Sequence, residues 1–164
     1  MGIPSKLIEF LNQNKVRYEI LHHPEAFTAQ ELAAIEQVKG KNHAKVVIMK
    51  ANGEMFMAVL AADRRVDLEK LDKVTGKCAS LATEVEFKSL FPDCAVGTMP
   101  PFGSLYTLKT YLDKSLAQDE FIVFEAGTHT DAVKMDYTDY ARLAQPIVAD
   151  IAIKLAHAGC REES

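Results

Sequence analysis

The sequence predicts a mixed α/β (α+β) fold, in which a mostly antiparallel, curled sheet is surrounded by helices. Its 164 residues, 48% of them apolar and 26% charged, suffice for one domain, which we place over residues 1–164. Segments with helical periodicity alternate with short β-branched and aromatic runs. Two of those runs are joined by Asn52-Gly53, a strong hairpin signal because both turn residues need positive φ.

The N-terminal part predicts a helix, a strand and a second helix. Pro4 suits the first turn of a helix, and the apolar residues within 7–11 then share one face. Residues 17–23 follow as a short strand. The segment TAQE at 28–31 has the spacing of a capping box, which opens a second helix that ends near Gly40.

The central part contains the hairpin that we expect to form the core. Residues 44–62 read AKVVIMKANGEMFMAVLAA, two apolar runs around the turn. Residues 68–71 predict one or two helical turns, and residues 78–82 predict a strand. A second capping box at 83–86 opens a short helix that ends near Phe91.

The C-terminal part predicts strands followed by a helix. Residues 105–112 and 119–127 are rich in β-branched and aromatic residues, so we expect two strands that pair with each other. Residues 133–135 predict a further short strand. Thr138 caps a closing helix, which a proline interrupts and which continues with helical periodicity through 147–159.

Charge and composition exclude several classes of protein. The net charge of −4 argues against a strong nonspecific nucleic-acid binder, so any contact with nucleic acid must be local. The N-terminus lacks signal-peptide features and no stretch approaches 18 apolar residues, so we expect a cytoplasmic protein without a membrane partner. Three widely spaced cysteines without C-x-x-C spacing predict reduced thiols, and we expect neither a metal nor a cofactor.

The segment VGTMPPFGSL at 96–105 sets two adjacent prolines between two glycines. Pro100 and Pro101 fix their φ angles and offer no N–H groups. Gly97 and Gly103 can adopt conformations that other residues avoid, and they let another group approach the backbone. Such a loop suits a site in which main-chain groups hold a ligand or orient a water, although it equally suits a stiff surface connection.

Several side chains are candidates for chemistry. Lys45 begins an apolar strand in a locally basic segment, which suits a ligand's phosphate, although a lysine there can also extend to water. His129 lies in a turn of small polar residues, where it either serves the site or hydrogen-bonds its own loop. His22 and His23 have no i, i+4 partner and are interpreted as structural. Cys94 is interpreted as a buried inert thiol rather than a nucleophile.

Taken in order, five segments resemble those of the YbaK family, also called the prolyl-tRNA synthetase-associated or editing-domain family. Its members hydrolyse wrongly charged aminoacyl-tRNA. The resemblance runs from about Lys6 to about Ala156, and it rests on HPEAFTAQE, AKVVIMK, AVLAADRRVDLEKL, GTMPPFG and EAGTHTDAVKM.

The resemblance implies roles for the candidate residues. Lys45 would anchor the 3′-terminal adenosine through phosphate, and the main chain of the loop that begins at Gly97 would contact the scissile carbonyl or the attacking water. His129 would orient the ribose or the carbonyl, and its presence favours the branch with the synthetase editing insertion and its alanine-specific relatives. The expected substrate-binding residues are Thr98, Met99, Pro100, Pro101, Phe102, Gly103 and Gly127. Thr98, Met99 and Phe102 are the candidates for shaping a small pocket, although Met99 equally suits the core.

The predicted function is therefore that of a trans-editing deacylase. An aminoacyl ester is already activated, so a positioned water and fixed N–H dipoles can hydrolyse it without a covalent intermediate. A synthetase pocket for proline cannot exclude smaller amino acids, since each missing methylene changes selection by only ~1–3 kcal/mol. Alanine on tRNA(Pro) is the first expectation, with cysteine, serine and threonine left open.

Expected partners are the tRNA acceptor end carrying a small amino acid and, as an open question, prolyl-tRNA synthetase. Because the chain is acidic, we expect weak, salt-sensitive binding of the tRNA body. The alternative function is a noncatalytic module that binds nucleotide or aminoacyl groups, or docks on a synthetase. A third, less favoured function is a thiol-dependent hydrolase that uses Cys94.

Overall fold

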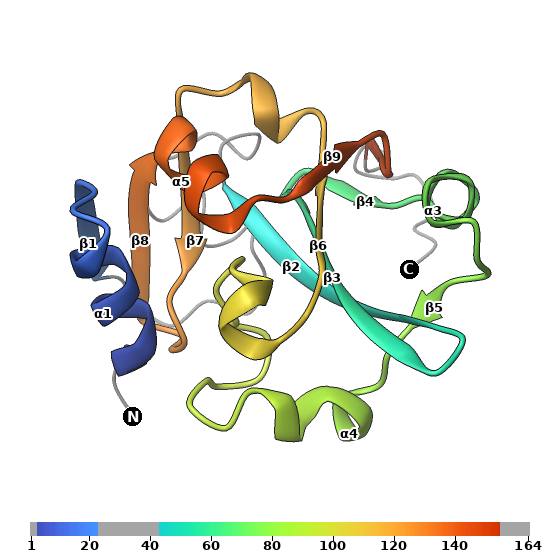
Figure 1. The fold of residues 1–164 in the computed structure, drawn as a ribbon, viewed down its shortest axis with the longest axis horizontal. Coiled ribbons are helices and arrows are strands. Elements are labelled where there is room, and N and C mark those ends of the chain that lie inside the picture. The colour runs from blue at the N-terminus through green and yellow to red at the C-terminus, as the bar shows by residue number, and fades with distance from the viewer. Residues whose placement is uncertain (1–2, 23–42, 155–164) are drawn as a thin grey trace, which may run out of the picture.

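Figure 1 shows a computed structural model of the chain, in which residues 3–22 and 43–154 are described. The strands form a three-stranded sheet in the order β1-β8-β7, a five-stranded sheet in the order β5-β2-β3-β6-β9, and the pair β10-β4. Most pairs are antiparallel, as predicted, but β6 pairs in parallel with both β3 and β9. The elements are α1 (Ser5–Gln13), β1 (Tyr18–His22), β2 (Ala44–Ala51), β3 (Glu54–Ala61), β4 (Arg64–Val66), α3 (Leu68–Thr75), β5 (Ser80–Leu81), α4 (Glu84–Phe87), η1 (Lys88–Leu90), η2 (Gly103–Tyr106), β6 (Thr110–Asp113), η3 (Leu116–Gln118), β7 (Phe121–Glu125), β8 (Asp131–Asp136), α5 (Tyr137–Ala144), β9 (Ile147–Ala149) and β10 (Ala152–Lys154).

The N-terminal helix and strand are confirmed. Pro4 directly precedes α1, and the helix buries Leu7 and Leu11 completely. Strand β1 pairs antiparallel with β8, with Tyr18 opposite Met135. The predicted helix at 28–40 lies outside the described residues.

The central hairpin β2–β3 is also confirmed, and its two faces contribute to two separate hydrophobic cores. Asn52 and Gly53 have φ angles of 53° and 80°, as the two-residue turn requires. Successive strand residues point to opposite faces, so Ile48 joins the larger hydrophobic core whereas Met49 joins a second, smaller one. Lys45 therefore shares the face of β2 that belongs to the smaller core.

The two short helices after the hairpin begin as predicted. Asp67 caps α3, and its side chain accepts a hydrogen bond from the backbone N–H of Lys70. Thr83 and Glu86 form a complete capping box at the start of α4. The intervening strand is confirmed only as the two residues of β5.

The prediction of a strand over 105–112 was partly wrong, as was its pairing with 119–127. Residues 103–106 form the 3₁₀ helix η2, and Thr107, with a φ of 62°, ends it. The strand β6 begins only at Thr110, and it pairs with β3 and β9, whereas β7 pairs with β8. Aromatic residues suit strands in general, but here the close packing of Gly103 on Thr110 imposes a tight turn instead.

The prediction of a helix through 147–159 was wrong for its described part. Residues 147–149 and 152–154 are the strands β9 and β10. Pairing with β6 overrides the helical periodicity, and the carboxylate of Asp113 accepts a hydrogen bond from the N–H of Ile151 at 3.0 Å. Asp136, rather than Thr138, occupies the N-cap position of α5.

One contact joins the five-stranded sheet to the three-stranded sheet and positions the candidate site. His43 forms a parallel bridge with Val123, and β2 lies against β7 there. Figure 1 shows the start of β2 beside β7. In the described part of the chain, no helix is both long and apolar enough to cross a membrane.

Candidate functional site

The proline-containing loop is embedded in the protein rather than lying on its surface. Residues 98–103 are buried, whereas Gly97 is exposed. The carbonyl of Ala95 accepts hydrogen bonds from the N–H of Thr98 at 3.1 Å and from its hydroxyl at 2.6 Å. The hydroxyl of Tyr140, itself fully buried, donates to the carbonyl of Pro101 at 2.7 Å. The loop is therefore a fixed element and not a free connection.

The apolar side chains of this loop belong to the larger core. The ring of Phe102 packs edge-on against Phe124 and Tyr140, with centroids 5.7 and 5.1 Å away. Met99 is 5% exposed and joins the same core, which agrees with its interpretation as core filler. Whether Thr98, Met99 and Phe102 also shape a pocket for the amino acid stays a prediction.

The two glycines that bound the loop are required for different reasons. Gly97 has a φ of 87°, and among the described residues no heavy atom lies within 4 Å of where its Cβ would be. A Cβ on Gly103 would lie 2.3 Å from the hydroxyl oxygen of Thr110 and 2.5 Å from the carbonyl oxygen of Leu108. Gly103 thus serves close packing, whereas Gly97 presents bare main chain to open space.

His129 lies in a tight turn between β7 and β8, and Asp131 holds this turn. The carboxylate of Asp131 accepts a hydrogen bond from the hydroxyl of Thr128 at 2.7 Å and contacts Nδ1 of His22 at 2.6 Å. Thr128 in turn accepts from the N–H of Thr130. His22 is thus part of a structural contact, while His23 lies outside the described residues.

Two backbone hydrogen bonds join this turn to the loop. The N–H of Gly127 donates to the carbonyl of Thr98 at 2.8 Å, and the N–H of Ala95 donates to the carbonyl of Gly127 at 2.9 Å. Gly127 has a φ of 88°, and a Cβ there would lie 2.4 Å from the ring of Pro4. The structure therefore brings together the segments of Gly97 and His129, which are far apart in the sequence. We call this contact the loop–turn junction.

Lys45 lies on β2, on the face that belongs to the smaller core, whereas Met99 and Phe102 of the loop belong to the larger core. His43 and Val123 form the parallel bridge between the two sheets. Lys45 follows His43 by two residues and Glu125 follows Val123 by two residues, so both lie on the same side of this bridge. Strand β7 ends at Glu125, so the turn with His129 follows directly. Lys45 also lines a cavity of about 560 Å³ to which the loop and the turn contribute no described residue.

Cys94 does not have the properties of a nucleophile. Its sulfur is buried 3.3 Å from the hydroxyl of Tyr106, which also donates to the carboxylate of Asp93. Burial raises the pKa of the Cys94 thiol to about 11, and the negative charge of Asp93 adds to this. The thiol is therefore protonated at neutral pH, as the sequence predicted. Among the described residues, no group of three or more His, Cys, Asp or Glu side chains is arranged to hold a metal ion.

Several residues that build this region were not predicted. Tyr140 and Asp131 fix the loop and the turn, and Arg65 lines the cavity next to Lys45. Asp131 carried a usable signal, because an acidic residue three positions after a threonine is typical of a turn closed by side-chain hydrogen bonds. Tyr140 carried none, since it reaches the loop only through tertiary packing.

The chain is similar to known proteins along most of its length. The sequence profile of a family described as the aminoacyl-tRNA editing domain matches residues 23–143. The chain is 32% identical over 148 residues to the multifunctional Ser/Thr-tRNA deacylase ProXp-y of Escherichia coli strain K12, covering 86% of this chain and 87% of that protein.

Solved structures show the same fold at low sequence identity. A hypothetical protein, APE2540, superposes with a TM-score of 0.82 at 20% identity, covering 91% of this chain and all of that one. A candidate trans-editing enzyme for prolyl-tRNA synthetase gives a TM-score of 0.80 at 21% identity, covering 90% and 95% of the two chains.

Proposed function

The chain belongs to the aminoacyl-tRNA editing domain family, and from this premise we propose that it hydrolyses the ester bond of mischarged aminoacyl-tRNA. The observation that supports this most is the loop–turn junction. It sets the exposed main chain of Gly97 and the imidazole of His129 on two segments that are hydrogen-bonded to each other.

The proposed reaction is direct attack by water on the ester carbonyl. The bond between the carbonyl carbon and the ribose oxygen breaks, and the products are a free amino acid and a tRNA with its terminal hydroxyl restored. The main chain at Gly97 holds the developing oxyanion or the water, and fixed dipoles of this kind are an effective means of stabilising such a charge. His129 orients the ribose or the carbonyl, and Lys45 holds a phosphate of the acceptor end.

We propose a small amino acid as the group that is removed. Alanine was the first expectation from the sequence, with serine and threonine among the alternatives. The relative named as a Ser/Thr-tRNA deacylase, at 32% identity over most of both chains, supports serine and threonine ahead of alanine. The structural neighbour described as a candidate trans-editing enzyme for prolyl-tRNA synthetase motivates the proposal that prolyl-tRNA synthetase is also a partner of this chain. Its sequence identity of 21% by itself supports only the shared fold.

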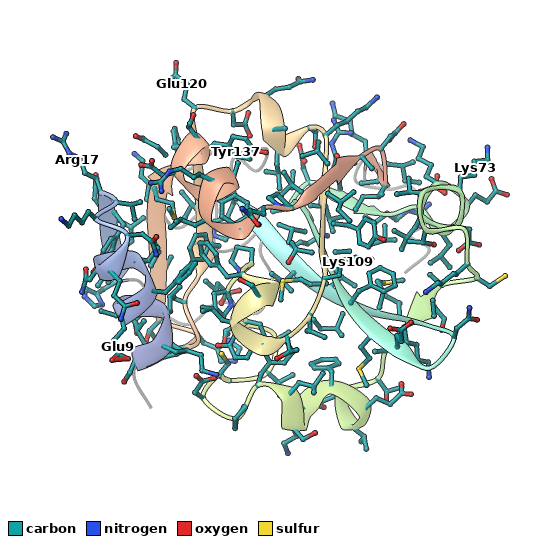
Figure 2. The ribbon with its side chains drawn as sticks, in the orientation of Figure 1. Glu9, Arg17, Lys73, Lys109, Glu120 and Tyr137 are labelled. Atoms are coloured by element: carbon teal, nitrogen blue, oxygen red, sulfur yellow. The ribbon has the colours of Figure 1, made fainter. Side chains whose placement is uncertain are left out.

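The charge distribution favours recognition of the acceptor end rather than of the tRNA body. The net charge is −4, and Figure 2 shows Arg17 and Lys73 projecting from opposite sides of the molecule. An acidic net charge disfavours strong binding along a duplex, because phosphate contacts dominate duplex affinity. We therefore expect weak, salt-sensitive binding of uncharged tRNA.

The test is a panel of Ala-, Cys-, Ser-, Thr- and Pro-charged tRNA, with the loss of the ester followed over time. We expect catalytic release of serine, threonine or alanine, and a strong loss of rate in Lys45→Ala. Lys73→Ala removes a comparable charge from the exposed end of α3 and should keep the wild-type rate. Protection of every ester without turnover would favour the noncatalytic binding module instead.

A further inference from the structure

The turn that carries His129 is closed at both ends by the pairing of β7 with β8. Strand β7 ends at Glu125 and β8 begins at Asp131. The N–H of Ala126 donates to the carbonyl of Asp131 at 3.0 Å, so residues 127–130 form the connection between the strands. Figure 1 shows this connection beside the start of α1. A loop this short has little conformational freedom once its ends are joined, so His129 has a narrowly defined place in the backbone.

The carboxylate of Asp131 fixes the backbone on both sides of His129. Its Oδ2 accepts a hydrogen bond from the hydroxyl of Thr128, the residue before His129, at 2.7 Å. The oxygen of that hydroxyl accepts in turn from the N–H of Thr130, the residue after His129, at 3.3 Å. Thr128 is only 7% exposed, so its hydrogen bonds are largely shielded from water. One carboxylate therefore ties down both neighbours of the histidine.

The other oxygen of this carboxylate is also engaged. His22 lies directly opposite Asp131 in the register of β1 and β8, and its Nδ1 is 2.6 Å from Oδ1 of Asp131. The side chain of Asp131 is 14% exposed, whereas that of His22 is 78% exposed. A carboxylate that is mostly removed from water is stable only when its oxygens have partners, and here each oxygen has one. The carboxylate of Asp131 thus has a single favourable orientation.

The imidazole of His129 has no such support of its own. It is half-buried, and within residues 3–22 and 43–154 the structure contains no hydrogen bond or ion pair of this side chain. Its position is therefore set by the backbone of the turn, which depends on Asp131. A displacement of about 1 Å in a site can slow a reaction about 10²-fold, so a residue that fixes this backbone affects the rate.

We infer that Asp131 is a positioning residue for ester hydrolysis, which holds His129 in place at the loop–turn junction. This inference rests on the proposed function, and it gives Asp131 a role that is exerted through His129 rather than by contact with the substrate. The hydrogen bond from the N–H of Gly127 to the carbonyl of Thr98 completes the path from the turn to the loop. His22 adds a weaker support, since its side chain is mostly exposed.

The test is a double-mutant cycle in the deacylation of Ser-tRNA, with Asp131→Ala, His129→Ala and the two combined. Asp131→Ala should lower kcat about tenfold or more and leave KM within about threefold of wild type. In the His129→Ala background the same change should cost less than about twofold, because a positioning residue then has nothing left to position. Asp131→Asn keeps an oxygen that accepts from the hydroxyl of Thr128 and should retain most of the wild-type kcat.

Asp139→Ala is the matched control, because its carboxylate contacts the guanidinium of Arg142 at 3.4 Å within α5, beyond the opposite end of β8. It should leave kcat and KM unchanged. Thr128→Val serves where thermal melts show that Asp131→Ala folds poorly, because it removes the hydroxyl that links Asp131 to Thr130 and keeps the side chain's shape. It should also lower kcat, again only when His129 is present.

The NMR signals of the His129 imidazole give a readout that does not depend on activity. They are assigned by their absence in His129→Ala, and they should shift in Asp131→Ala but not in Asp139→Ala. Equal losses of kcat from Asp131→Ala with and without His129 would overturn the positioning role, as would unshifted imidazole signals or a wild-type kcat in both Asp131→Ala and Thr128→Val. If the wild type hydrolyses no ester while the imidazole signals shift as expected, Asp131 still positions His129 and the proposed hydrolysis is what fails.

Discussion

The substitution Gly97→Ala tests whether the main chain of the loop takes part in hydrolysis. Gly97 has a φ of 87°, and among the described residues no atom would contact an added Cβ. The cost of the change is therefore backbone strain alone, about 1–2 kcal/mol for an L-residue in the left-handed region. In a domain of this size, such a loss lowers Tm by roughly 2–8 °C.

Gly53→Ala is the matched control for that strain. Gly53 has a φ of 80° in the hairpin turn, and again no described atom lies within 4 Å of an added Cβ. Thermal melts of both variants should show similar losses of stability. Deacylation of Ser-tRNA, measured well below both Tm values, should be slowed only by Gly97→Ala, because only this change displaces the peptide groups at the loop–turn junction.

The expected loss of kcat in Gly97→Ala is about tenfold or more, since removing one oxyanion donor commonly costs 10²–10³. A Gly97→Ala variant with the wild-type kcat and the stability of Gly53→Ala would refute the role that we assign to this main chain. A much larger loss of stability than in Gly53→Ala would refute the premise that strain is the only cost.

Three further predictions concern the surroundings of the site. Gly127→Ala should unfold the region or lower its stability by more than Gly97→Ala does, as measured by thermal melts. The added Cβ would lie 2.4 Å from the ring of Pro4, and this clash comes on top of the strain of a φ of 88°. Tyr140→Phe should cost about 1–3 kcal/mol in urea unfolding, because the carbonyl of Pro101 loses its buried donor. At pH 8, iodoacetamide should modify Cys94 about two orders of magnitude more slowly than an ordinary thiol, because its pKa is raised to about 11 and the thiolate is correspondingly rare.

The predictions for Tyr140 and Cys94 each have an internal comparison. Tyr137→Phe removes a hydroxyl from the half-buried neighbour of Tyr140 and should cost less in the same titration. Cys78 is exposed and should react at an ordinary rate in the same labelling experiment. Fast modification of Cys94, or loss of deacylation in Cys94→Ala, would reopen the thiol-dependent mechanism.

Local signals in the sequence predicted the elements whose ends are set by short-range chemistry. The hairpin at Asn52-Gly53 and the capping box at Thr83 and Glu86 both formed as predicted, because each depends on only a few neighbouring residues. The segment 147–154 failed because its apolar spacing fits a helix, whereas parallel pairing with β6 makes part of it a strand. A parallel partner leaves no local signal, since its two strands are distant in the sequence.

The candidate site likewise contains residues that could be predicted from the local sequence and others that could not. Gly97 and Lys45 stood out because a proline-glycine loop and a lysine at the head of an apolar strand are unusual in themselves. Their surroundings could not be predicted, because Arg65 and Leu81 reach the cavity beside Lys45 through the folding of β4 and β5 around β2. Leu81 also has no distinguishing property in the sequence, and only its exposure in the folded protein draws attention to it.

The reactive side chains beside the loop–turn junction favour attack by water over a covalent intermediate. The hydroxyl of Thr98 donates to the carbonyl of Ala95, and that of Thr128 donates to the carboxylate of Asp131. The hydroxyl of Thr98 contacts a carbonyl, which cannot take its proton, and the hydroxyl of Thr128 contacts a carboxylate, which is a much weaker base than the histidine that usually activates a hydroxyl nucleophile. The Cys94 thiol is protonated at neutral pH. If the ester is held at Gly97, as we propose, it meets fixed peptide dipoles and solvent, and an activated ester requires little more than these for hydrolysis.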